Sequence, residues 1–478
     1  MRDIACTHVL TAASAAAVGN HTIRIEGERI TDVVPATGAS EQLFALPPLA
    51  NAHDHARPTR TSSFGTAGKP LESWLSFLAL MPPVDPYLAN VVPLARSALG
   101  GAASVMIHCT RAQGLTDIAT EAATVARAAR DVGVRVGFAF AVRDRNPLVY
   151  GPSEPILAAL SPAAREEIAR RFMRPALPVA ELIALTDAIA AAAENPMFDV
   201  QYGPAGVQWC SEPLLEGIAE ASARTGRRVH MHLLETRYQR EWADRAYPDG
   251  IVKFLDKIGL LSPRLTLAHC TWARPDELDL IAERGAVMSC NTSSNLHLRS
   301  GIAPLAEMVK RGCRVALGLD GATLDEDDDA LREMRLAELI HSGSGFRIDV
   351  DRAAILNAVL ANGRFAVTNR TDGGKLVAGE PADVLLLDWN ALDGDRLLPE
   401  IDPRDLLFAR STMRHIKELI VAGRTIVRDG RVTGIDFAAL NEELHARFRH
   451  GIAQNGALKT ALPELEKAVR DHFEPPCC

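Results

Sequence analysis

The chain has 478 residues, of which 47% are hydrophobic and 23% are charged, a balance typical of an ordinary globular protein. Its formal net charge of -8 disfavours a nucleic-acid or anionic-membrane partner, because phosphate binding requires a basic face. Small neutral or cationic molecules are therefore the better candidates for what it binds.

The sequence predicts a cytoplasmic protein. The N-terminal stretch "MRDIACTHVLTAASAAAVGNH" contains only short apolar runs, unlike a secretory signal peptide. No segment reaches the roughly 20 consecutive apolar residues that a membrane span requires. The eight cysteines are scattered without a CxxC pair, so we expect reduced thiols, Cys477 and Cys478 included.

Short strands are predicted at both ends of the central region. In "HTIRIEGERITDVVP" (21–35) two alternating segments flank a glycine-centred turn. The same pattern returns in "KLVAGEPADVLLLD" (375–388) and "HIKELIVAGRTIVRDGRVTG" (415–434). We therefore expect one small β-sandwich domain built from residues 1–47 and 375–435.

Between these flanks, eight apolar strings are each followed by a turn and a longer amphipathic segment. They are PPLANAH (47–53), ASVMIH (103–108), VRVGFAFAV (134–142), FDVQYG (198–203), RRVHMHL (227–233), RLTLAH (264–269), AVMSC (286–290) and CRVALGLD (313–320). Such strings are typical of strands buried on both faces. The fold class is therefore α/β, a (β/α)8 TIM barrel over residues 48–374, with chemistry at the C-terminal ends of the strands.

The end of the chain predicts helix. "DFAALNEELHARFRHGIAQ" (436–454) has a helical apolar pattern, so we assign residues 436–478 to a C-terminal helical tail. Its last residues, "EPPCC", are expected to fray.

Polar residues interrupt the strings at their C-terminal ends. They are His53 and His55 (first string), His230 and His232 (fifth), His269 (sixth) and Asp320 (eighth). All are expected on one rim of the barrel, where imidazole nitrogens and a carboxylate suit Zn2+ or Fe2+. A lone HxH also fits an exposed turn, and an aspartate before glycine is often a turn former. The coincidence of several strand ends favours the metal site.

Three nearby residues each have two interpretations. Glu235 lies three residues after His232 and is either a general acid/base or a helix N-cap or surface glutamate. His108 ends the second string, and we favour a pocket-lining role over metal ligation. His230 shares a side with His232 by strand alternation, or it is a hydrogen-bonded core histidine.

Five segments together resemble the metal-dependent amidohydrolase superfamily, specifically its aminohydrolase branch with adenosylhomocysteine-type deaminases, guanine deaminase and triazine hydrolases. These segments are "NAHDH", "HMHLLET", "LAHC", "NTSSNLHLRSGIAP" and "ALGLDGATLDEDDDALREMRLA". The resemblance covers nearly the whole chain. It implies that His53, His55, His232 and Asp320 bind one divalent metal ion, Zn2+ in the first place and Fe2+ as the alternative. Binuclear relatives use a modified lysine at the fourth strand, and "FDVQYGPAG" has none.

The resemblance also implies a reaction. Metal-bound hydroxide would attack a ring carbon of an amino-substituted N-heterocycle, of purine, pterin, pyrimidine or triazine type, and ammonia would leave. Asp320 would accept the proton of the water, Glu235 would shuttle protons, and His269 would stabilise the oxyanion. The alternatives are removal of chloride or an alkylamine, cleavage of an amide C–N bond, and a non-catalytic metal-binding scaffold. The scaffold predicts loss of a ligand or of Glu235, and none is lost.

Several residues are candidates for substrate binding. Adenosine-type members have a histidine in a "GPHSP"-like segment where this chain has Ala205, in "YGPAGVQWCS". In that loop Gln208 offers an amide contact, and Trp209 either stacks on a flat heterocycle or packs below the loop. Trp74 matches an aromatic on the substrate-covering loop of relatives, and Asn295 is expected to fix its own loop.

Two arginines after the first string have no assigned role. Arg57 and Arg60 either hold a carboxylate or carbonyl of the substrate or pair with the acidic run "DEDDD" (325–329). That run more readily serves a helix N-terminus than a cation site. Asp54 is expected to point away from the metal into the hydrogen bonds of the barrel wall. The resemblance further implies a homodimer or higher homo-oligomer.

Overall fold

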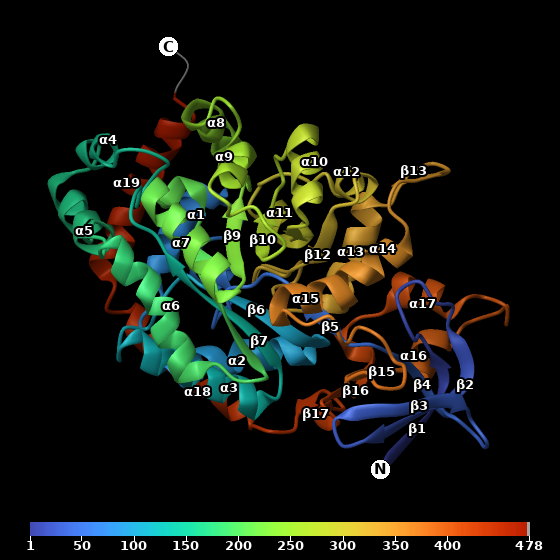
Figure 1. The fold of residues 1–478 in the computed structure, drawn as a ribbon. Helices are drawn as coiled ribbons and strands as arrows, with labels where there is room; N and C mark the ends of the chain where they lie inside the picture. The colour runs from blue at the N-terminus through green and yellow to red at the C-terminus, as the bar shows by residue number, and fades with distance from the viewer. Residues whose placement is uncertain (476–478) are drawn as a thin grey trace.

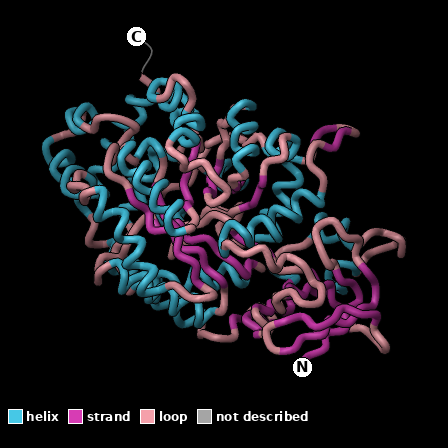
Figure 2. Tube along the Cα trace, in the orientation of Figure 1, coloured by secondary structure: helices cyan, strands magenta, loops and turns pink. Residues whose placement is uncertain are grey.

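The computed structural model describes residues 1–475 and shows a barrel with a second β-sheet beside it (Figure 1 and Figure 2). The prediction that "EPPCC" frays, and the thiols of Cys477 and Cys478, fall partly or wholly on residues 476–478, which lie outside the described residues. Within residues 1–475 no helix is long and apolar enough to cross a membrane.

All eight predicted barrel strands are present. They are β5 (Leu49–Asn51), β6 (Ala102–Cys109), β7 (Arg135–Val142), β8 (Phe198–Pro204), β9 (Val229–Leu233), β10 (Leu265–His269), β11 (Val287–Cys290) and β12 (Arg314–Leu317). Neighbours pair in parallel in this order. The ring closes where the nitrogen of Ala52 donates to the oxygen of Leu317 over 2.9 Å. The (β/α)8 prediction is therefore confirmed.

Helices follow the strands and cover the barrel. The longer ones are α2 (Pro86–Leu99), α3 (Ile118–Val132), α5 (Pro162–Phe172), α6 (Val179–Ala193), α7 (Glu212–Thr225), α8 (Arg237–Ala246), α10 (Pro275–Arg284) and α13 (Ala330–His341). The shorter ones are α1 (Leu71–Phe77), α4 (Glu154–Ala158), α9 (Ile251–Lys257), α11 (Thr292–His297), α12 (Leu305–Lys310), α14 (Arg352–Asn357) and α15 (Gly363–Thr368). A hairpin, β13 (Gly343–Ser344) and β14 (Arg347–Ile348), follows α13.

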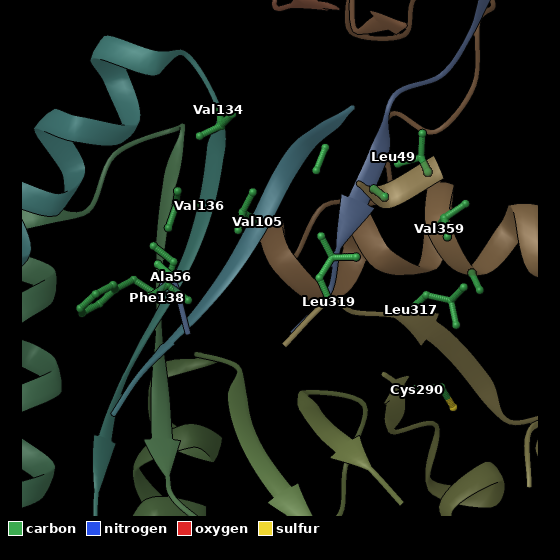
Figure 3. Close-up of a cluster of buried hydrophobic side chains, with 14 of the residues drawn as sticks. Leu49, Ala56, Val105, Val134, Val136, Phe138, Cys290, Leu317, Leu319 and Val359 are labelled. Carbon is green, nitrogen blue, oxygen red and sulfur yellow. The ribbon is translucent and has the colours of Figure 1, made fainter. Parts of the chain in front are cut away.

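The apolar strings form the core because both faces of each barrel strand are covered. Val105, Val136 and Phe138 point away from the solvent and are at most 1% exposed (Figure 3). Local signals set the helix ends: Asp117 caps α3 by accepting from the nitrogen of Thr120, and Gly133 ends it with φ of 99°.

Strands from both ends of the chain come together in a separate β domain, as predicted, and they form one eight-stranded sheet. Its order is β18-β17-β16-β15-β4-β1-β2-β3. The strands are β1 (Arg2–Val9), β2 (Val18–Glu26), β3 (Arg29–Pro35), β4 (Glu41–Leu46), β15 (Val384–Asp388), β16 (Ile416–Val421), β17 (Arg424–Arg428) and β18 (Arg431–Val432). The sheet has a core of its own, with Ile4, Ile23 and Ile420 among its buried residues. Two short helices, α16 (Trp389–Asp393) and α17 (Pro403–Arg410), follow β15. The domain boundaries stay predictions.

The C-terminal segment forms two helices, α18 (Phe437–Ile452) and α19 (Gly456–Phe473). Helix α19 runs beside α5 and α1, where Leu458, Leu462 and Leu465 join a buried cluster with Ile168 (Figure 1). The tail is thus packed against the loops that follow the barrel strands.

Candidate metal centre and active site

Four side chains from three strand ends meet at one rim of the barrel. His53 and His55 follow β5, His232 lies in β9, and Asp320 follows β12. The Nε2 atoms of His55 and His53 lie 3.0 and 3.4 Å from Oδ1 of Asp320. Nε2 of His232 lies 3.4 Å from Nε2 of His55. The structure therefore brings together all four predicted ligands.

Hydrogen bonds to the Nδ1 atoms, on the side away from the centre, orient the histidines. Nδ1 of His55 donates to the main-chain oxygen of His108, and Nδ1 of His232 donates to that of Ala205, each over 2.7 Å. These bonds leave the lone pair of each Nε2 facing the centre. Nδ1 of His53 lies 2.7 Å from Nε2 of His230, so His230 supports His53 from behind.

The centre fits a divalent cation. Among residues 1–475, Nε2 of His53 and Oδ1 of Asp320 are buried without a hydrogen-bond partner. Unpaired buried polar atoms are unfavourable unless something binds them. Three imidazoles and one carboxylate are a common donor set for Zn2+, and the described residues include groups able to hold a metal ion.

The protonation states also suit metal binding. Burial lowers the pKa of His53 to about 3, so its imidazole is neutral. Burial alone would raise the pKa of Asp320, but the adjacent His53 and His55 side chains hold that pKa well below its usual range. Neutral imidazoles and an ionised carboxylate are the forms that bind metal ions.

Glu235 and His269 face each other beside this centre. Nε2 of His269 lies 3.6 Å from Oε2 of Glu235, and Oγ of Ser300 donates to Oε1 of Glu235 over 3.3 Å. Burial, and then the charge of Asp320, raise the pKa of Glu235 well above its usual value. The cap of α8 is Thr236, so the alternative of Glu235 as a helix cap or surface residue is wrong.

Backbone strain gathers at these strand ends. Leu234, His269 and Asp320 have φ of 50°, 74° and 53°, in the left-handed region that non-glycine residues seldom adopt. Nonglycine residues in this region cluster at functional sites because the surrounding structure must hold them there. The residues with strained backbone therefore lie at the same rim of the barrel as the candidate metal ligands.

The two arginines of the first loop have different partners. The Arg57 guanidinium lies 4.6 Å from the ring centroid of buried Trp74, and its Nη1 donates to the main-chain oxygen of Asp320 over 3.2 Å. Arg60 instead donates from Nε to the main-chain oxygen of Glu326 over 2.9 Å. Arg57 therefore belongs to the candidate site, whereas Arg60 binds the acidic loop.

The other candidate substrate residues lie around His232 and His269. The Trp209 ring is half-buried, 6.4 Å from the His232 ring and perpendicular to it. Gln208 is buried, with Nε2 unpaired among residues 1–475. Oδ1 of Asn295 lies 2.9 Å from Nδ1 of His269, so Asn295 holds that histidine.

The acidic run serves the start of a helix and its surroundings. Asp329 caps α13 by accepting from the nitrogen of Arg332 over 3.1 Å, and Asp328 pairs with Arg96 over 2.9 Å. Among the described residues, the run belongs to no group able to hold a metal ion. Asp54 accepts from Nδ2 of Asn51 over 2.7 Å, in the barrel wall as expected.

Some residues of the site were missed by sequence reasoning. Oγ of Ser294 donates to Oδ2 of Asp320 over 2.5 Å, and Glu72 and Tyr150 lie behind Glu235. Ser294 lies inside the quoted "NTSSNLHLRSG" segment, and Glu72 lies two residues before Trp74. These residues therefore lie in or next to segments that the sequence singled out, but the sequence does not show which side chains they contact.

The chain belongs to the amidohydrolase family, because residues 44–426 match the model of that family. It is similar to a 5'-deoxyadenosine deaminase of Methanothermobacter thermautotrophicus, with 31% identity over 49% of this chain and 54% of the relative. It thus spans about half the length of that relative. A 5-methylthioadenosine/S-adenosylhomocysteine deaminase of Desulfovibrio desulfuricans is 28% identical over 84% of this chain and 83% of the relative.

Solved structures share the fold. A zinc complex of atrazine chlorohydrolase from Arthrobacter aurescens superimposes with a TM-score of 0.77 at 21% identity, covering 93% of this chain and 99% of that one. A guanine deaminase of C. acetobutylicum gives 0.69 at 15% identity, covering 89% and 100%.

Proposed function

We propose that the chain is a metal-dependent hydrolytic deaminase of an amino-substituted N-heterocycle, of purine, pterin, pyrimidine or triazine type. The observation that carries this proposal is the position of Glu235, a buried carboxyl with a raised pKa, beside His269 and Asp320. Relatives named as deaminases of 5'-deoxyadenosine and methylthioadenosine support it.

His53, His55, His232 and Asp320 would hold one divalent ion, with Zn2+ favoured because related structures contain zinc. When bound, such an ion supplies Lewis-acid chemistry and lowers the pKa of a water molecule. Oδ1 of Asp320, which has no hydrogen-bond partner among residues 1–475, would accept the proton that the attacking water loses, while Ser294 fixes Oδ2 of the same carboxylate.

Glu235 supplies the proton that the ring nitrogen gains. Burial raises its pKa, which favours the protonated carboxyl that a general acid needs. Once ionised, Glu235 would take up the proton of the new hydroxyl group as the carbonyl forms, and the proton that Asp320 accepted from the water would pass to the departing amine, which leaves as ammonia. His269, held at Nδ1 by Asn295, would hydrogen-bond the developing oxyanion once its Nε2 carries a proton.

Around this centre, Arg57, Trp74, Gln208, Trp209 and Asn295 are proposed to bind the substrate. Two of them would contribute by positioning another residue of the site, since Trp74 packs under the Arg57 guanidinium and Asn295 hydrogen-bonds His269. A cytoplasmic location and a homodimer or larger assembly are further proposals, drawn from the sequence.

The test is a panel of purines, pterins, pyrimidines and triazines, assayed for ammonia and, with chlorinated triazines, for chloride. We expect ammonia release from at least one amino-heterocycle. Glu235→Gln should bind as much metal as the wild type yet lose roughly 10²- to 10⁴-fold in kcat, because the proton donor is gone. Glu216→Gln, on the exposed side of α7, is the matched control. Chloride release alone, or full activity of Glu235→Gln, would contradict the proposal.

A further inference from the structure

A closed ring of hydrogen bonds lies behind Glu235. The nitrogen of Glu235 donates to Oε1 of Gln239 over 2.9 Å, and Nε2 of Gln239 donates to Oη of Tyr150 over 3.3 Å. Tyr150 and Thr236 then both donate to Oε1 of Glu72, over 2.8 and 2.6 Å. Because Thr236 follows Glu235 in the chain, the ring is complete.

The ring joins three parts of the chain that are far apart in sequence. Glu72 lies in α1, Tyr150 lies between β7 and α4, and the other members surround the start of α8. All are buried, none more than 8% exposed. Buried hydrogen bonds of this kind are expensive to break, because an abandoned partner has no water to replace it. The ring therefore fixes the backbone from which the Glu235 side chain projects.

Stability alone does not explain why residue 72 is a glutamate. Its Oε2 is buried without a partner among residues 1–475, and burial raises the pKa of the carboxyl. An unpaired buried carboxyl oxygen is unfavourable. Violations of this kind are expected where function requires them.

Helix α19 holds the ring from outside. The Phe473 ring lies 5.3 Å from the Tyr150 ring, which also contacts Trp209 at 5.8 Å. Next to Glu72 in α1, Oγ of Ser73 donates to Oε1 of Glu466 over 2.7 Å. Helix α19 lies outside residues 44–426, the part that matches the family model.

We propose that Glu72 and Tyr150 are positioning residues for Glu235, supported by α19. This inference rests on the proposed function of Glu235 as the proton donor. Within residues 1–475 no member of the ring hydrogen-bonds His53, His55, His232 or Asp320, and Glu235 alone of the ring faces His269. Their contribution is geometric, because a proton donor displaced by about 1 Å can lose on the order of 10²-fold in rate.

Tyr150→Phe is the sharpest variant, because it removes one oxygen atom and opens the ring between Gln239 and Glu72. We expect kcat to fall by roughly tenfold, with KM and bound metal unchanged. Glu72→Leu should lose more, whereas Glu72→Gln keeps a carbonyl acceptor for both donors and should lose less. Tyr87→Phe is the matched control, since its hydroxyl donates to Asp131 over 3.0 Å at α2 and α3, away from the rim.

Amide hydrogen exchange provides a readout that does not depend on activity. The amides of Glu235 and Gln239 should exchange faster in Tyr150→Phe and Glu72→Leu than in the wild type or Tyr87→Phe, because both are held within the ring. If the amides of Glu235 and Gln239 exchange at the wild-type rate in these variants, the ring does not hold the backbone at Glu235. If they exchange faster but kcat is unchanged, Glu72 and Tyr150 have no positioning role. If the wild type deaminates nothing, the proposed function fails, while the exchange data still decide whether the ring holds Glu235.

Discussion

Arg57 is a buried cation at the centre of a site that is otherwise rich in carboxylates. Its Nη1 donates a hydrogen bond to the main-chain oxygen of Asp320, and its guanidinium lies over the ring of Trp74. Its Nε and Nη2 have no hydrogen-bond partner among residues 1–475. A guanidinium fork of this kind matches a carboxylate or carbonyl oxygen. Among the described residues Arg57 forms no ion pair with the acidic run, so substrate binding stays its proposed role.

The proposed role of Arg57 predicts a change in selectivity. Pterin and pterin-6-carboxylate, or cytosine and 5-carboxycytosine, form pairs that differ by one carboxylate. In Arg57→Met, kcat/KM for the carboxylated member should fall at least roughly tenfold more than for its partner, since a charge-assisted hydrogen bond is lost. Arg60→Met, whose guanidinium binds Glu326, is the control. An equal loss for both members would show that Arg57 only balances the local charge.

The meeting of the four candidate metal ligands could be predicted from the sequence because the strand ends share one rim. His53, His55, His232 and Asp320 each follow or end an apolar string, and parallel strands bring such positions together. What orients them could not be predicted in the same way. The partner of His55 is a main-chain oxygen of His108, and no side-chain pattern encodes that contact.

Helices α11 and α13 meet at a buried carboxyl close to the site. Glu333 in α13 accepts from the nitrogen of Ser293 over 3.0 Å and from its hydroxyl. The next residue, Ser294, holds Asp320. Burial raises the pKa of Glu333 from 4.5 to about 7, so the native state binds its proton more tightly than the unfolded state does.

This pKa shift predicts a pH dependence of stability. The contribution of protonated Glu333 is fully present below about pH 4.5 and is lost as the pH rises through about 7. The free energy of unfolding of the wild type should therefore fall by about 3 kcal/mol relative to Glu333→Gln over that interval. Urea unfolding of both proteins from pH 4.5 to 8 measures it. A constant difference between them would contradict the shift.

Strands and helices were easier to predict than their packing. The eight barrel strings carry their own signal in unbroken runs such as "VRVGFAFAV", and the structure has a strand at each. Helix α18 was likewise visible in its apolar periodicity. The position of α19 against the barrel could not be predicted, because it depends on contacts such as that of Lys69 with Glu466, which lie 397 residues apart in sequence.

At the scale of the whole molecule, the candidate metal site lies where the first and the last strand of the barrel meet. His53 follows the first strand and Asp320 the last, and the nitrogen of Asp320 donates to the oxygen of His53 over 2.9 Å. A ligand bound only by the native state stabilises it, by roughly 4 kcal/mol at 1,000 times its Kd. Bound metal should therefore stabilise the closed barrel as a unit.

Chelation is expected to lower the Tm of the wild type by several degrees, as measured by calorimetry, and added Zn2+ should restore it. In His232→Ala the effect of chelation should be much smaller, because one ligand is missing. His450→Ala, at an exposed position of α18, should respond like the wild type. An equal response in His232→Ala would place the stabilising ion elsewhere.

The central claim is that the chain hydrolyses its heterocycle with an ion held by His53, His55, His232 and Asp320. The most direct measurement is a titration of Zn2+ into chelated protein, with ammonia release and bound metal followed together. We expect activity to rise in proportion to bound metal and to level off at about one ion per chain. Full ammonia release by metal-free protein would contradict the account.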